Sequence, residues 1–179
     1  MQTFPVSWEA SAILIYMDFT PMKPTVVILD YLPGYQSSVR AILTKIGWAE
    51  QYVTAAEQNM QNLSMDKENY GVYLAISEEK AVGFLYVQYY AWNQLCQIHG
   101  LAVDVDFHRQ GIASALVARA EEFARSKKAR GIYVDTPTAN TRGRKFYEAI
   151  GYQLGYIMPR YYEDGLDGVT YQKFFESLI

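Results

Sequence analysis

The chain has 179 residues, half of them hydrophobic, with a formal net charge of −3 and a single cysteine. This length favours one compact domain with one core. No run of basic residues is present, which argues against a nucleic-acid surface or an anionic-membrane surface, because both depend on clustered Lys and Arg. Cys96 cannot form an intrachain disulfide, and two histidines are too few to complete a zinc site with it. We therefore expect a reducing, cytoplasmic setting and no metal.

The first residues are interpreted as an extension that precedes the domain. Their apolar run, Ala10–Met17, lacks a basic region before it and is too short to span a bilayer, so we expect no membrane segment. A β-rich run follows directly after Met22, which looks like a natural start. The expected division is an N-terminal extension over residues 1–21 and one domain over residues 22–179.

The N-terminal part of the domain predicts one strand and then two helices. The β-branched run Thr25–Tyr31 is typical of a strand. The first helix is expected to have Ser37 or Ser38 as its N-cap and to end at Gly47, and the second to cover Glu50–Leu63.

Three β-rich runs follow and predict a meander: Tyr70–Ile76, Ala81–Trp92 and Leu95–Val105. Gly100 interrupts the third run, where a bulge or a close backbone approach is expected.

A long helix is predicted from Gly111, with Gly131 standing where a residue just past the helix end belongs. It carries an apolar stripe that consists of Ile112, Leu116, Ala120 and Ala124. The remaining elements are a strand over Gly131–Pro137, a helix over Asn140–Gly151, and strands over Tyr152–Met158 and Val169–Phe175. This order predicts one α+β domain with a mixed sheet.

The start of the long helix is a candidate anion site. Its first turn has small residues, Gly111, Ala113 and Ser114, and no acidic side chain, so its unpaired amides are accessible. His108 and Arg109 stand beside it. The alternative is an ordinary turn between a strand and a helix. The dinucleotide-binding pattern GxGxxG and the phosphate-loop ending GK[ST] are both absent.

Two linked motifs, "LAVDVDFHRQGIASAL" and "NTRGRKFYEAIGY", resemble the fourth strand with its pyrophosphate loop and the later helix of the GNAT superfamily of N-acetyltransferases. The similarity runs from about Met22 to the end and includes the ribosomal-protein alanine and peptide N-acetyltransferase branch. His108 departs from the Gln or Arg that opens the family's loop, and Gly143 and Arg144 depart from its usual residues.

The resemblance implies a mixed, mostly antiparallel central sheet flanked by helices and splayed between the fourth and fifth strands. It also implies acetyl-CoA as co-substrate, with the pyrophosphate on the loop amides and the pantetheine arm paired with the fourth strand. The cofactor-binding residues implied are Leu101, Val103, His108, Arg109, Gln110, Gly111, Ile112, Ala113, Ser114, Asn140 and Tyr147. Judged from the residues alone, Leu101 and Val103 would be core side chains, Arg109 a solvent-facing side chain, and Asn140 a helix N-cap.

Direct attack by an amine needs a route for its proton and an acid for the leaving thiolate. Leu95 stands where this branch of the family has a glutamate, so we expect His99 as the base, or water relayed through Gln97 or a carbonyl. A structural histidine is the alternative for His99. Tyr147 matches the family's general acid, and the alternative is a packed aromatic residue.

The acceptor is expected to be a primary amine, either a small molecule or a peptide. Tyr161, Tyr162 and Glu163 lie in the loop with which the family lines its acceptor site, although a solvated hairpin tip would look the same. A homodimer is expected from the sheet edges. The alternative function is a catalytically weak acyl-CoA sensor or assembly module with the same fold.

Overall fold

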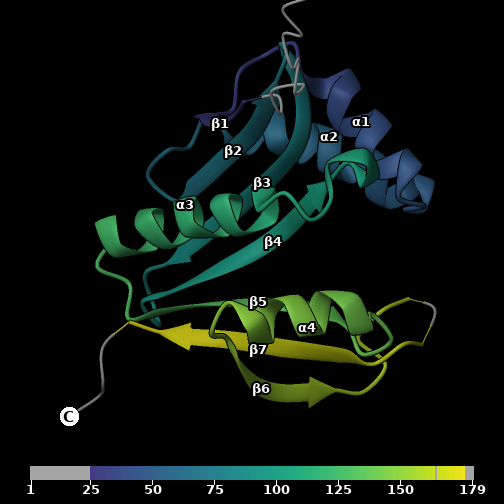
Figure 1. Ribbon diagram of the computed structural model, residues 1–179. Coiled ribbons are helices and arrows are strands. Elements are labelled where there is room, and N and C mark those ends of the chain that lie inside the picture. The colour runs from purple at the N-terminus through teal and green to yellow at the C-terminus, as the bar shows by residue number, and fades with distance from the viewer. Residues whose placement is uncertain (1–24, 164, 176–179) are drawn as a thin grey trace, which may run out of the picture.

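The computed structural model describes residues 25–163 and 165–175, whose strands form one mixed sheet (Figure 1). Within these residues the sheet has seven strands in the order β1-β2-β3-β4-β5-β7-β6. Neighbouring strands are antiparallel except β4 and β5, which are parallel. The strands are β1 (Val26–Asp30), β2 (Tyr70–Ser77), β3 (Lys80–Tyr90), β4 (Leu95–Val103), β5 (Gly131–Pro137), β6 (Gln153–Met158) and β7 (Gly168–Phe174).

Helices cover both faces of the sheet. Figure 1 shows α3 and α4 over one face and α1 and α2 over the other, so we call these the α3/α4 face and the α1/α2 face. The helices are α1 (Gln36–Lys45), α2 (Glu50–Leu63), α3 (Ile112–Ser126) and α4 (Thr141–Ala149). The stripe on α3 is buried against the sheet, where Leu116, Ala120 and Ala124 are inaccessible to solvent. This arrangement is the expected α+β fold.

Two helix ends differ from the sequence prediction. Neither serine caps α1: the helix begins at Gln36, whose side chain instead accepts a hydrogen bond from the amide of Gly34. The long helix α3 ends at Ser126, and the residue with left-handed backbone just beyond it is Lys128 (φ 55°) rather than Gly131. Gly131 is needed in β5, because an added Cβ there would lie 2.8 Å from the ring of Phe174.

The sheet opens between β4 and β5. These strands pair only from Leu95 with Gly131 to Ile98 with Val134. Beyond that pair, β4 continues for five residues to Val103 without a strand on this side, which confirms the predicted splay. Figure 1 shows the two strands diverging toward the start of α3. The open side of β4 therefore presents unpaired backbone groups.

A bulge in β4 lies beside this opening. Tyr86 of β3 pairs with Gly100 and Val87 pairs with Ile98, so His99 is an extra residue in β4. Gly100 is required there, because an added Cβ would lie 2.2 Å from the ring of Tyr86. The predicted irregularity at Gly100 is thus confirmed. It shifts the alternation of side chains by one residue, so Leu101 and Val103 face α3 as Cys96 and Ile98 do.

Asn140 sets the start of α4. Its Oδ1 accepts a hydrogen bond from the amide of Gly143 at 3.0 Å, and its Nδ2 donates to Oγ1 of Thr136 at 2.9 Å. Gly143 makes room for this arrangement, since an added Cβ would lie 2.5 Å from Nδ2 of Asn140. The N-cap role predicted for Asn140 is confirmed, and it explains the glycine at position 143.

We expect Asn140→Ala to lower the free energy of unfolding by about 1 kcal/mol, because α4 loses its cap and Thr136 loses its donor. Chemical denaturation would measure this loss. Asn140→Asp is the matched control: it keeps an oxygen for the Gly143 amide and should lose less stability. Wild-type stability for the alanine variant would contradict the assignment.

Candidate active site

The open edge of β4 offers amides that no strand uses. The amide of Asp104 donates to the carbonyl of Val82 in β3. Because amides alternate in direction along a strand, those of Leu101 and Val103 point to the other side, into the opening. Their side chains pack in the core under α3, as expected for core residues. Any role for these two residues at the opening is consequently a backbone role.

This edge leads directly to the start of α3. Arg109 (φ 63°) and Gly111 (φ 80°) both have left-handed backbone, which curls the chain around the first turn of the helix. No side chain caps α3, and no acidic residue lies in its first turn. The amides at this end have no capping side chain, and they lie at the positive pole of the helix dipole, so the local chemistry suits an anion.

The side chains of this loop have different surroundings. Arg109, Gln110 and Ser114 are exposed, Ala113 is half-buried, and Ile112 is buried in the core under α3. Arg109 forms no ion pair with a described residue. Lys45 holds the loop from outside through Asp104 at 2.7 Å and Asp106 at 2.6 Å.

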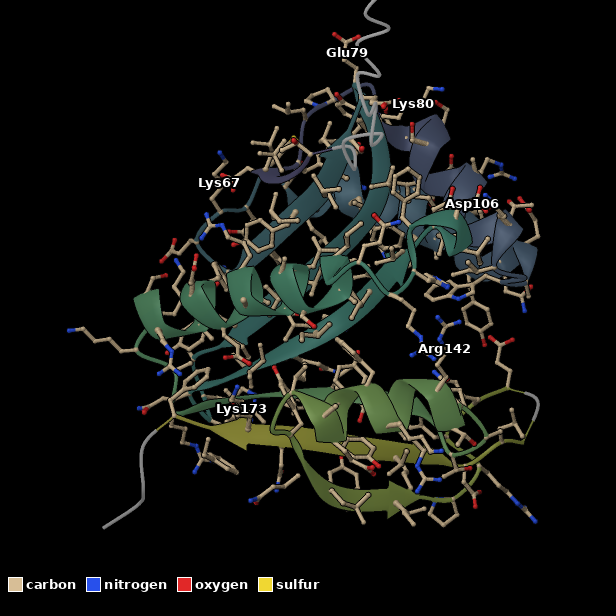
Figure 2. All side chains as sticks on the ribbon, in the orientation of Figure 1. Lys67, Glu79, Lys80, Asp106, Arg142 and Lys173 are labelled. Carbon is tan, nitrogen blue, oxygen red and sulfur yellow. The ribbon has the colours of Figure 1, made fainter. Side chains whose placement is uncertain are left out.

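His108 and Arg142 bridge the opening. His108 Nε2 lies 2.8 Å from the carbonyl oxygen of Val103, and its Nδ1 lies 2.8 Å from a guanidinium nitrogen of Arg142 in α4. Because arginine only donates, Nδ1 accepts and Nε2 carries the proton that it donates to Val103. Figure 2 shows Arg142 extending from α4 toward the loop before α3. Arg142 was not among the predicted site residues, since nothing in its local sequence pattern places it near residue 108.

Tyr147 lies on the α3/α4 face, in α4. It is buried, with an exposed fraction of 6%, and it contacts the rings of Phe146, Tyr152 and Tyr171. Burial strongly raises the pKa of Tyr147, and the negative charge on a deprotonated Tyr162 would raise it further. The phenol therefore stays protonated at neutral pH. Its hydroxyl forms no hydrogen bond with a described residue.

His99 lies on the opposite, α1/α2 face, at the bulge. Its Nε2 is 3.0 Å from Oε1 of Gln88 and 3.4 Å from the hydroxyl of Tyr90. Although His99 has a large accessible surface, its ring lies beside those of Tyr86 and Tyr90. This loss of water lowers the pKa of His99, against a smaller opposing effect of Asp135. His99 is consequently uncharged at neutral pH.

The side chain of Gln97 is fully engaged at its oxygen. That oxygen accepts hydrogen bonds from the hydroxyls of Tyr133 at 2.9 Å and Tyr90 at 3.2 Å. Its amide nitrogen donates to Asp135 at 2.9 Å. Both lone pairs of the oxygen are therefore in use, which makes Gln97 a poor relay for a proton compared with His99.

Asp135 was not predicted as a site residue. It follows Val134, the last residue of β5 that pairs with β4, so it lies where the two strands separate. Its carboxylate accepts hydrogen bonds from Thr170 at 2.7 Å, from Gln97 at 2.9 Å and, at 3.5 Å, from Tyr161. The alternation of side chains along Gly131–Pro137 could have predicted that Asp135 lies on the face opposite Val134. It could not have predicted that Asp135 lies at the opening between β4 and β5.

The loop between β6 and β7 brings aromatic rings to Asp135. Tyr161 and Tyr162 pack edge to face with ring centroids 5.0 Å apart. Burial, with a smaller effect of the Asp135 charge, raises the pKa of both phenols, which remain neutral. Glu163 is exposed and forms no ion pair with a described residue, so of the three predicted acceptor residues only the two tyrosines lie at this cluster.

Other chemistry has little support in the described part of the chain. Among those residues no group of three or more His, Cys, Asp and Glu side chains could hold a metal ion. No helix in residues 25–163 and 165–175 is long and apolar enough to cross a bilayer. Cys96 is buried, and burial raises the pKa of its thiol to about 12, so the thiol stays protonated.

Known proteins share both the sequence pattern and the fold. Streptothricin acetyltransferase A of Bacillus subtilis (strain 168) is 23% identical over 138 residues, which are 76% of this chain and 79% of that protein. The ribosomal-protein-alanine N-acetyltransferase of Escherichia coli superposes with a TM-score of 0.67 at 17% identity, over 87% of this chain and 97% of that one. PaiA N-acetyltransferase of Thermoplasma acidophilum, in complex with coenzyme A, gives a TM-score of 0.68 at 12% identity, over 84% and 99% of the two chains.

The match to the family model covers most of the domain. The model of the acetyltransferase (GNAT) family matches residues 40–152, from α1 through α4 to the start of β6. This range contains the open edge of β4, the uncapped start of α3, and Tyr147. The chain therefore belongs to the GNAT family of acetyltransferases.

Proposed function

We propose that this protein transfers an acetyl group from acetyl-CoA to a primary amine by direct attack of the amine on the thioester. The observation that carries the proposal is the continuous path from the open edge of β4 to the uncapped start of α3. An amide-rich pantetheine arm matches the first, and a pyrophosphate matches the second. The structurally similar PaiA N-acetyltransferase was solved with coenzyme A, which supports the same co-substrate.

The residues present fit acetyl-CoA. The amides of residues 109–114 and the helix dipole would hold the pyrophosphate, with Arg109 free to add a charge-assisted contact. The amides of Leu101 and Val103 would pair with the pantetheine arm and polarise the thioester carbonyl. His108 and Arg142 stand on the same edge, where Arg142 offers a second cation to the co-substrate.

The two faces of the sheet would divide the proton transfers. His99, on the α1/α2 face, is uncharged at neutral pH and can accept a proton from the acceptor amine through Nδ1, directly or through water. Tyr147, on the α3/α4 face, keeps its proton and can give it to the departing thiolate. In this scheme the amine enters from the α1/α2 face and the thiol leaves toward the α3/α4 face. The base and the acid therefore have to lie on different faces of the sheet.

Thiol release from acetyl-CoA tests the function. The assay would present polyamines, aminoglycosides, amino acids and peptides with free lysine or N-terminal amines, and it would follow the thiol with a colour reagent. Release that depends on one class of amine supports the transferase. Tight binding of coenzyme A without release for every class would favour a sensor.

We expect Tyr147→Phe to lower kcat about tenfold or more and to leave the affinity for coenzyme A nearly unchanged, because only the proton donor is lost. Tyr152→Phe is the matched control, because Tyr152 is a buried tyrosine in the same aromatic cluster. Equal kcat values for the two variants would show that the Tyr147 hydroxyl does no chemistry.

The pH dependence of kcat/KM tests His99. Because its pKa is lowered from 6.5, the uncharged base predominates at pH 7 and is lost only as the pH falls through that lower pKa. The wild-type profile should therefore lose activity on the acid side below pH 6.5. His99→Gln should lower kcat/KM about a hundredfold and remove this acid limb, whereas His108→Gln should keep it. An acid limb that persists in His99→Gln would assign the base elsewhere.

A further inference from the structure

Asp135 is a half-buried carboxylate without a counter-charge. Its three partners, Thr170, Gln97 and Tyr161, are all neutral donors. No Lys, Arg or His among the described residues lies within ion-pair distance of it. For comparison, the half-buried Glu121 on the other face pairs with Lys173 at 2.9 Å. A carboxylate removed from water favours a cationic partner, so this position is suited to one supplied by a ligand.

The network holds this carboxylate in one orientation. Because the oxygen of Gln97 accepts from Tyr90 and Tyr133, its amide nitrogen must point to Asp135. Thr170 holds the other carboxylate oxygen from the paired position on β7. Each oxygen still has acceptor capacity beyond these bonds. The carboxylate is thus fixed before a ligand arrives.

The surroundings favour an ammonium group over other cations. The rings of Tyr161 and Tyr162 lie at this carboxylate, and those of Tyr90 and Tyr133 contact it through Gln97. Neutral aromatic faces attract an ammonium ion. A metal ion would need further carboxylates or imidazoles, and among the described residues no group of three or more His, Cys, Asp and Glu side chains could hold one. The cluster therefore has the chemistry of an alkylammonium site.

Its position is next to the thioester of the proposed co-substrate. Asp135 is the first residue of β5 beyond the last pair with β4, and His99 is the extra residue of β4 at the same level. Leu101, whose amide points into the opening, follows His99 by two residues, or about 7 Å of strand. A cation held by Asp135 would lie within one side-chain length of the point of attack and beside the candidate base.

We propose that Asp135 binds the ammonium group of the acceptor, and that it supplies from β5 the negative charge that β4 lacks. This inference rests on the proposed function, since it names the acceptor as a cationic alkylamine. Asp135 then selects and positions the acceptor, and His99 takes the proton. Weakly basic and neutral acceptors are disfavoured, because they leave the carboxylate without a partner.

Binding of a tertiary amine tests the site without catalysis. N,N-dimethylbutylamine is protonated at neutral pH and can donate one N–H, but it cannot form an amide. Calorimetry on the protein saturated with coenzyme A should show tighter binding of this amine than of a neutral alcohol of similar length. Asp135→Asn should weaken the binding of the amine about tenfold or more and leave the alcohol unchanged.

Two further variants keep the test decisive. Asp135→Glu retains the charge and should retain most of the preference for the amine. Glu79→Gln is the control: Glu79 is exposed in the turn between β2 and β3, and Figure 2 shows it far from Arg142 and the opening. Unchanged affinity for coenzyme A in Asp135→Asn would verify its fold. Equal affinities for amine and alcohol in the wild type, or an Asp135→Glu variant that behaves like Asp135→Asn, would overturn the proposal.

The same variants separate this inference from the proposed function. If the wild-type protein binds the tertiary amine through Asp135 but releases no thiol with any primary amine, the ammonium site is supported and the transferase function is rejected. If Asp135→Asn releases thiol with the same preference among acceptors as the wild type, the transferase function is supported and the ammonium site is rejected.

Discussion

The hydrogen-bond ladder between β4 and β5 ends at Ile98 and Val134. The candidate active site depends on this early end, because it leaves the rest of the β4 backbone unpaired on that side. Beyond it, the backbone of β4 has polar groups that no strand satisfies, and such groups in a protein interior require a partner. His108 accounts for one of these groups, the carbonyl of Val103. A peptide-like arm can form hydrogen bonds with the remaining backbone groups of β4. Binding of such an arm in the opening would therefore satisfy polar groups that no strand pairs.

The bulge at His99 decides which chemistry lies on which face. Before the bulge, Cys96 and Ile98 face the core under α3, and after it Leu101 and Val103 do so. Without the extra residue, this alternation would turn Leu101 away from the core under α3 and toward the α1/α2 face. The bulge thus keeps the core continuous under α3 and leaves the side chains of His99 and Gln97 on the α1/α2 face.

Electrostatics differ on the two sides of the sheet. On the α3/α4 face, burial holds Tyr147 in its protonated form. On the α1/α2 face, partial burial holds His99 in its uncharged form, and Asp135 lies among neutral donors. The two faces therefore present a proton donor and a proton acceptor at the same pH, because burial favours the uncharged form of each.

Local signals in the sequence were sufficient to predict the order of strands and helices, the apolar stripe of α3, and the start of α3 at Gly111, because periodicity and capping act over a few residues. The two linked motifs were sufficient for the family. Asp135 and Arg142 required the tertiary structure, because their partners Thr170 and His108 are more than thirty residues away in the chain. The sequence alone determined which elements form and where the long helix α3 begins. Only the folded sheet decided which side chains meet at its opening, because strand pairing and the β4 bulge set that register.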